Sequence, residues 1–311
     1  MKKFASIDIG SQTIRLLVAE CNAAGGFTPM YRDRSIVRLG EGMNREKHLK
    51  QDSIERAVRC ISNFVKKAKE YNVSEIFPVA TACVRNAENA RSFLETVYSQ
   101  TAIMPSVISG EEEALLSLKG VQSVVTSGNG ISLIIDIGGG STELIVTRNT
   151  TLSMAESIPL GVIGLSEKHL HHDPPLDREI RKLKADARHI LESKSFTLRE
   201  LVTNKSQPVL IGTAGTVTTL AAMDLKMTDY NPDKINGHIL LCNNIEKLFE
   251  EMIALSSQKR SLMPGLETGR AIVIIPGTVI VQTIMEIFDR KELMVSDAGL
   301  LEGVILEKMG V

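Results

Sequence analysis

The stretch from Ile134 to Val146 constrains the fold of this chain more than any other part of the sequence. It reads Ile-Ile-Asp-Ile-Gly-Gly-Gly-Ser-Thr-Glu-Leu-Ile-Val, two apolar runs joined by glycines and hydroxyl residues. This pattern predicts a β-hairpin with a glycine-rich tip. Because glycine has no Cβ, the backbone of the tip can approach a ligand closely, and successive N–H groups can form an anion-binding concavity.

Two carboxylates, Asp136 and Glu143, stand at the strand ends on either side of this tip. Mg²⁺ prefers a few hard oxygen ligands and keeps waters and phosphate oxygens in its remaining positions. The pair therefore predicts a magnesium site next to a bound phosphate. The alternative is an ordinary glycine turn with two solvated acids. A second copy of the pattern makes this alternative the weaker interpretation.

That second copy lies at the N-terminus, in the stretch from Phe4 to Val18, 128 positions earlier. Its aligned positions are Asp8 with Asp136, Gly10 with Gly138, and Thr13 with Ser141. Repeats so far apart predict two similar domains, each of which offers a phosphate loop to a shared cleft. A third loop of this type, Gly212-Thr213-Ala214-Gly215-Thr216, follows another apolar strand and precedes a predicted helix, whose N-terminus favours anions.

Composition narrows the class of protein. The chain has 311 residues, a net charge of −1 and 43% hydrophobic residues, which fits two globular domains and gives no sign of a nucleic-acid binder. No apolar run reaches the length of a membrane span, and Met1-Lys2-Lys3 leads straight into a strand, so we expect neither a membrane anchor nor a signal peptide. Four scattered cysteines fit reduced thiols in the cytoplasm.

The segment Ser109-Gly110-Glu111-Glu112-Glu113-Ala114 opens a predicted helix. Ser109 as N-cap and Glu112 at the third helical position form a capping box, and acids in a first turn suit the helix dipole. These roles explain Glu111 and Glu112 but do not require Glu113. Glu113 lies one turn in from the cap, so the cap does not account for it.

Three other features have two interpretations each. His169, His171, His172 and Asp173 could bind a metal, although solvated loop histidines before Pro174 are the favoured interpretation. The helix predicted at 176–193 carries a mixed set of charges, of which a solvated face is the default interpretation. Arg270 could reach a substrate or be an ordinary surface arginine.

Taken together, the loops resemble a known superfamily, that of actin, the sugar kinases and the 70-kDa heat-shock proteins. Its pattern is matched by Asp8-Ile9-Gly10-Ser11, the 81–86 loop, the hairpin tip, the 212–216 loop and Asp297-Ala298-Gly299. Within it, Ala80-Thr81-Ala82-Cys83-Val84-Arg85-Asn86-Ala87, the 108–114 segment and 136–143 resemble the exopolyphosphatase / guanosine pentaphosphate phosphohydrolase (Ppx/GppA) family. The chain is similar to its short two-domain members, although Gln12-Thr13 and Leu301 depart from the usual Asn-Ser and arginine.

The resemblance implies roles for individual residues. Glu113 would be the general base, Asp136 and Glu143 would hold Mg²⁺, and Arg85 would face the anionic substrate. The phosphate-binding residues would be Gly10, Ser11, Gln12, Thr13, Arg85, Gly138, Gly139, Gly140, Ser141, Thr142, Gly212, Thr213, Gly215 and Thr216.

It also implies an α/β fold of two actin-like, ribonuclease H-like domains, each with a five-stranded mixed sheet and flanking helices. The first domain would comprise residues 1–118 and 297–311, and the second 119–296, with the active site in the cleft between them. The implied reaction is the Mg²⁺-dependent release of terminal orthophosphate from inorganic polyphosphate, guanosine pentaphosphate or both. A non-catalytic sensor of guanosine pentaphosphate or tetraphosphate and a kinase or ATPase of the same superfamily are the alternatives.

The expected partner is the polyphosphate or guanosine pentaphosphate substrate. A homodimer is also compatible with the sequence. We do not expect the protein to bind nucleic acid or a membrane. No strongly basic track is visible beyond the mixed helix at 178–188. The sequence therefore predicts that short polyphosphates compete well with long ones.

Overall fold

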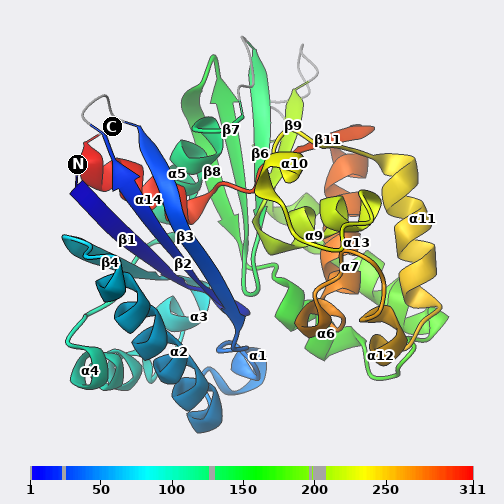
Figure 1. Cartoon of the computed structure of the whole chain (residues 1–311). Coiled ribbons are helices and arrows are strands. Elements are labelled where there is room, and N and C mark those ends of the chain that lie inside the picture. Colours follow the sequence, from blue (N-terminus) through cyan, green and yellow to red (C-terminus); the bar gives the residue numbers. More distant parts are fainter. Residues whose placement is uncertain (1, 23–25, 126–129, 196–197, 199–207, 311) are drawn as a thin grey trace. The chain divides into compact units, whose positions relative to one another are not determined.

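The computed structural model describes residues 2–22, 26–125, 130–195, 198 and 208–310. The chain forms two compact units, which Figure 1 shows coloured along the sequence. Unit 1 comprises Met1–Ser123 and Gly299–Val311, and unit 2 comprises Val124–Ala298. Each unit has one mixed β-sheet with flanking helices, as predicted.

Unit 1 is built on a five-stranded sheet in the order β3-β2-β1-β4-β5. Its first three strands form an antiparallel meander, and β4 and β5 add to it in parallel. The strands are β1 (Lys2–Ile9), β2 (Thr13–Cys21), β3 (Phe27–Ile36), β4 (Glu75–Ala80) and β5 (Ser106–Val107). The helices are α1 (Met43–Glu46), α2 (Gln51–Glu70), α3 (Ala82–Arg85), α4 (Ala90–Thr101), α5 (Gly110–Gln122) and α14 (Leu300–Met309).

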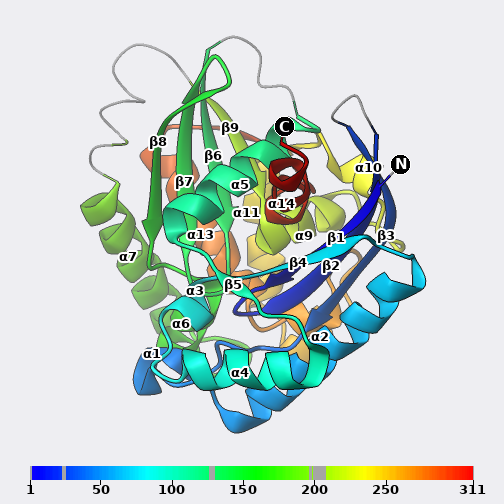
Figure 2. The same ribbon diagram turned by 90° about the vertical axis from the view of Figure 1, so that its left-hand side faces the viewer.

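Helices cover both faces of the unit 1 sheet. Apolar residues of α2 recur at helical spacing, and with α4 they bury one face of the sheet. The C-terminal helix α14 returns to the other face, where Leu301 and Ile305 pack against Leu17 and Ala19. Figure 2 shows α14 lying beside α5. This contact is close, because a Cβ added at Gly303 would lie 1.8 Å from the Leu116 carbonyl oxygen.

Unit 2 is built on a six-stranded sheet in the order β10-β11-β9-β6-β7-β8. The strands are β6 (Ile131–Ile137), β7 (Thr142–Arg148), β8 (Thr151–Ile158), β9 (Val209–Thr213), β10 (Ile239–Leu241) and β11 (Glu292–Val295). The helices are α6 (Val162–His169), α7 (Asp177–Lys194), α9 (Ala214–Asp224), α10 (Pro232–Ile235), α11 (Cys242–Ile253), α12 (Ser257–Arg260), the 3₁₀ helix η1 (Thr268–Arg270) and α13 (Ile274–Ile287).

The sixth strand is a correction to the predicted five. β10 has only three residues, which pair antiparallel with β11 at the edge of the sheet. A segment this short shows no alternating pattern of its own. Its pairing depends on β11, which lies about 50 positions away in the sequence.

The core of unit 2 lies on one face of its sheet. Alternate residues of β6, including Leu133, Ile135 and Ile137, pack there with helices α6, α7, α9 and α13. Helix α13 is buried along almost its whole length, as its apolar sequence requires. None of the described helices combines the length with the apolar character that crossing a bilayer needs.

Candidate active site

The two predicted hairpins have tips of the same construction. The N–H of Gly10 donates to the Thr13 carbonyl oxygen at 3.2 Å, and the N–H of Gly138 donates to the Ser141 carbonyl oxygen at 2.9 Å. A Cβ at Gly10 would lie 2.9 Å from that same Thr13 oxygen, so the tight turn excludes a side chain. The repeat in the sequence is thus a repeat in backbone structure.

The remaining N–H groups of each tip do not take part in closing the turn. Within the described part of the chain, no acceptor bonds the N–H groups of Ser11 and Gln12, or those of Gly139 and Gly140. Adjacent backbone N–H groups that lack an acceptor of their own can form an anion-binding concavity. Gly10 and Gly138 use their own N–H groups to close the turns, so they shape the concavities and do not donate into them.

Neighbouring segments hold the second tip in place from behind. The N–H groups of Val162 and Ile163, which open α6, donate to the carbonyl oxygens of Gly138 and Gly139 at 3.2 and 3.0 Å. The buried hydroxyl of Thr142 donates to the Leu160 carbonyl oxygen at 2.6 Å. Thr142 therefore anchors the hairpin to the segment before α6 through its side chain.

The two hairpins differ in the charged pair that flanks the tip. In unit 1, Asp8 lies opposite Arg15, whose Nε and Nη2 donate to Asp8 Oδ2 at 2.9 and 2.6 Å. In unit 2, Asp136 lies opposite Glu143 in the same register. Directly opposed side chains of antiparallel strands are close neighbours on one face of the sheet. The first hairpin therefore contains its own cation, whereas the second places two carboxylates together.

This second pair suits a divalent metal ion. Asp136 is 7% exposed and Glu143 is 1% exposed. The hydroxyls of Ser141 and Ser157 both donate to Glu143 Oε1 at 2.7 Å, which orients the carboxylate. Opposed like charges repel, and a hard cation with oxygen ligands would offset that repulsion. The donor set fits Mg²⁺, and Ser157, which the sequence analysis missed, supports it from β8.

Glu113 lies in the first turn of α5. The predicted capping box is confirmed, because the Ser109 hydroxyl accepts from the Glu112 N–H and the Glu112 carboxylate accepts from the Ser109 N–H. Glu113 instead is 8% exposed and accepts a hydrogen bond from Arg85 Nη1 at 3.1 Å. The same Nη1 donates to the Ile108 carbonyl oxygen at 2.8 Å. Arg85, predicted to face the substrate, therefore holds the proposed base in position.

Two buried polar atoms beside the first tip have no hydrogen-bond partner in the described structure. They are Asp8 Oδ1, an acceptor, and the amide nitrogen Nε2 of Gln12, a donor. Burying such groups unpaired is costly, so they call for a ligand or ordered water. The departure at Gln12 thus places an amide donor without a protein acceptor beside this tip.

The third predicted loop joins β9 to α9. β9 runs parallel to β6 with Thr213 beside Asp136, so the loops that follow these two strands leave the same edge of the sheet. The Thr213 hydroxyl is buried and donates to the Ala298 carbonyl oxygen at 2.9 Å, which ties the loop to the end of unit 2. Ala214 has a φ of 65°, a left-handed conformation that costs energy for any residue with a Cβ and that clusters at functional sites.

Arg270 is not the ordinary surface residue that was one interpretation of the sequence. It is 7% exposed, and its Nε donates to Glu267 Oε2 at 3.1 Å. A Cβ added at Gly215 would lie 2.2 Å from Arg270 Nη1. Gly215 therefore leaves space for the Arg270 guanidinium group directly against the third loop. The sequence of this loop alone gives no sign of that cation. Thr216, also predicted to bind phosphate, packs against Gly277 in α13.

Almost the whole chain matches a known family. A sequence model of the Ppx/GppA phosphatase family matches residues 17–311. The chain belongs to this family. Its resemblance to that family and its actin-like two-domain fold are thereby confirmed.

Individual relatives agree with this assignment. The chain is 33% identical to a bifunctional 3-dehydroquinate synthase/phosphatase of Fusobacterium nucleatum over 97% of its length, but spans only 46% of that protein. It is 28% identical to exopolyphosphatase 2 of Mycobacterium tuberculosis, covering 100% of this chain and 99% of that one. The crystal structure of the Aquifex aeolicus Ppx/GppA family member matches with a TM-score of 0.79 and 30% identity, covering 99% and 97% of the two chains.

The histidines at the end of α6 and just after it do not form a metal site, since no group of three or more His, Cys, Asp or Glu side chains that could hold a metal ion occurs among the described residues. The His169 ring is hydrogen-bonded to Asp186 and the His172 ring to Glu179, both at 2.8 Å. Asp173 instead accepts hydrogen bonds from the N–H and hydroxyl of Ser257.

Glu179 organises the start of α7. Burial alone would raise its pKa, but hydrogen bonds from the His172 ring and from the N–H groups of Leu176 and His171 lower the pKa to about 2. The unfolded value is about 4.3. Because the folded pKa is the lower one, the ionised form favours folding above about pH 4.3, and this contribution is lost as the pH falls toward 2.

We therefore expect Glu179→Gln to lower the free energy of unfolding at pH 7 by about 1–3 kcal/mol, because backbone N–H groups lose a charged acceptor. The difference from the wild type should shrink as the pH falls below about 4.3. Urea unfolding at a series of pH values measures both effects. Glu192→Gln, which removes an exposed partner of Arg188, is the matched control and should change stability little. Unchanged stability of Glu179→Gln at pH 7 would contradict this role.

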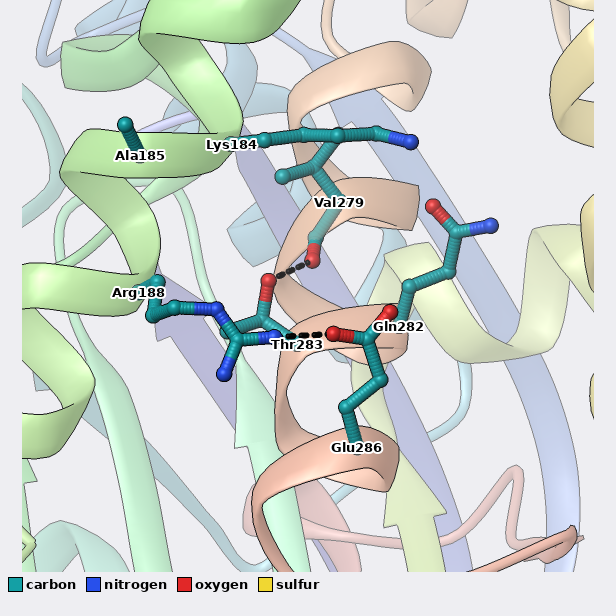
Figure 3. A pocket seen from close by; sticks show the side chains of 7 residues that line it. All are labelled: Lys184, Ala185, Arg188, Val279, Gln282, Thr283 and Glu286. Atoms are coloured by element: carbon teal, nitrogen blue, oxygen red, sulfur yellow. Dashed lines mark hydrogen bonds and ion pairs between the residues drawn. The ribbon is translucent and has the colours of Figure 1, made fainter.

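The mixed charges of α7 fall on two sides of the helix. Figure 3 shows the pocket of about 180 Å³ on the side that faces α13. There Arg188 pairs with Glu192 and Glu286, and Lys184 Nζ lies 4.6 Å from the centre of the Phe249 ring. The cations on this side are engaged within the protein, so this pocket does not favour an anion.

Proposed function

We propose that this protein is a Mg²⁺-dependent phosphohydrolase that releases terminal orthophosphate from inorganic polyphosphate, guanosine pentaphosphate or both. The observation that carries the proposal is the hairpin β6–β7, where two buried carboxylates lie beside a tip whose Gly139 and Gly140 N–H groups have no acceptor among the described residues. Membership of the Ppx/GppA phosphatase family and the similarity to an exopolyphosphatase support it.

Hydrolysis of a phosphoanhydride requires mainly that the reacting groups are positioned and that charge is stabilised. The N–H groups of Gly139 and Gly140 in one tip, and of Ser11 and Gln12 in the other, would bind phosphoryl oxygens. The Gln12 amide nitrogen adds a donor that has no protein acceptor in the described structure. Arg270, seated against Gly215, would add positive charge at the third loop.

Glu113 would take the proton from the attacking water. Its carboxylate is nearly buried, so little bulk water competes for it, and the hydrogen bond from Arg85 fixes its orientation. Asp136 and Glu143 would hold Mg²⁺, with Ser141 and Ser157 orienting Glu143. When bound, this ion would neutralise charge on the phosphoryl oxygens.

A phosphate-release assay tests the proposal. We expect release from polyphosphate or guanosine pentaphosphate that depends on added Mg²⁺, and little release from ATP. Binding of guanosine pentaphosphate without turnover would instead indicate a sensor. Turnover of ATP alone would indicate an ATPase or kinase, and either result would overturn the proposal.

A further inference from the structure

A second pocket in unit 2, which we call the cationic pocket, lies where α6 ends and α7 begins. It encloses about 270 Å³. The side chains that define it for this argument are Lys168, His171, His172, Arg178, Glu179 and Lys182. No functional residue proposed above lies in it.

The positive charge in this pocket is only partly neutralised. Arg178 and Lys182 lie one helical turn apart and therefore on the same side of α7. Neither makes an ion pair with any residue that the structure describes. The carboxylate that lines the pocket, Glu179, already accepts hydrogen bonds from the His172 ring and two backbone N–H groups. Lys168 shares Asp186 with His169.

The cationic pocket is joined to the second glycine tip by a single helix within the same unit. The first N–H groups of α6 donate to the carbonyl oxygens of Gly138 and Gly139, and Lys168 lies in its last turn. α6 has eight residues, which corresponds to a length of about 12 Å. A polyanionic chain held at the tip by its end would therefore need to extend only a short way to reach these cations.

We propose that the cationic pocket binds internal phosphates of an inorganic polyphosphate chain whose terminal phosphate lies at the tip of β6–β7. This inference rests on the proposed function. The ligand is a chain that carries charge along its length, because the pocket offers several cations and, besides imidazole, no aromatic ring on which a base would stack. It replaces the expectation from sequence that chain length matters little.

The test compares two double variants of the same helix. Arg178→Gln/Lys182→Gln removes two charges from the cationic pocket. Lys184→Gln/Arg188→Gln removes two charges from the side of α7 that faces α13, so both variants have the same net charge. Binding of long-chain polyphosphate and of tripolyphosphate is measured by calorimetry in EDTA at several salt concentrations, with thermal unfolding as the check on folding.

We expect the first variant to bind long-chain polyphosphate about tenfold more weakly or worse, with tripolyphosphate affected far less. For this variant, the slope of log Kd against the logarithm of the salt concentration should also decrease by about one to two, by analogy with proteins that bind nucleic-acid backbones. The second variant should bind like the wild type. An equal loss in both variants, or no loss in the first, would overturn the inference.

Hydrolysis measured in parallel separates this inference from the proposed function. If the wild type hydrolyses neither substrate, the proposed function fails, while the binding comparison in EDTA still decides the role of the pocket. If the wild type hydrolyses both, kcat/KM for the long chain alone should fall in Arg178→Gln/Lys182→Gln.

Discussion

Glu113→Gln is expected to lower turnover by at least about 10²-fold while the protein stays folded and binds substrate. The substitution removes the proton acceptor but keeps the shape of the side chain. The glutamine can still accept the hydrogen bond that Arg85 now donates at 3.1 Å. Single-turnover phosphate release, together with equilibrium binding of polyphosphate, separates a lost base from a lost binding contact.

The neighbouring Glu112 offers a matched control in the same helical turn. Its carboxylate accepts a hydrogen bond from the Ser109 N–H, and hydrogen bonding with Ser109 lowers the pKa of Glu112. Glu112→Gln should therefore weaken the helix cap and lower the unfolding temperature somewhat, with turnover near that of the wild type. Normal turnover in a folded Glu113→Gln variant would remove Glu113 from the proposed mechanism and direct attention to Glu112.

Asp136→Asn and Glu143→Gln should each raise the Mg²⁺ concentration for half-maximal activity by about 10–100-fold, because each removes one anionic oxygen from a hard cation's site. A second measurement does not depend on catalysis. Ligands that bind only the folded state stabilise it. Mg²⁺ should therefore raise the unfolding temperature of the wild type, and raise it much less in either variant.

Two further variants sharpen this experiment. Ser157→Ala removes one of the two hydroxyls that orient Glu143 and should give a smaller shift in the same direction. Asp224→Asn changes a carboxylate of the same unit that pairs with His238, away from the hairpin, and should leave the Mg²⁺ requirement unchanged. Identical Mg²⁺ saturation in the wild type and both hairpin variants would show that the metal is held elsewhere.

The sequence by itself determined the elements whose signals are local. Alternating apolar runs around glycines predicted both hairpins, and the spacing of Ser109 and Glu112 predicted the capping box that separates Glu113 from its neighbours. The repeat predicted two similar units, because a duplicated backbone device leaves its mark at equivalent positions of the chain.

Only the tertiary structure decided how side chains from distant strands and helices pair. Strand register set Arg15 against Asp8, Glu143 against Asp136, and Ser157 against Glu143. No local pattern encodes register between strands, since it emerges from the packing of the whole sheet.

The same holds for charge. Along the sequence, the cations of α7 alternate with acids and read as a solvated face. In the folded unit, Lys184 and Arg188 are engaged on one side, whereas Arg178 and Lys182 meet Lys168 of α6 on the other. Helical geometry separates residues that are neighbours in sequence, and packing brings α6 beside them, so the positive pocket exists only in three dimensions.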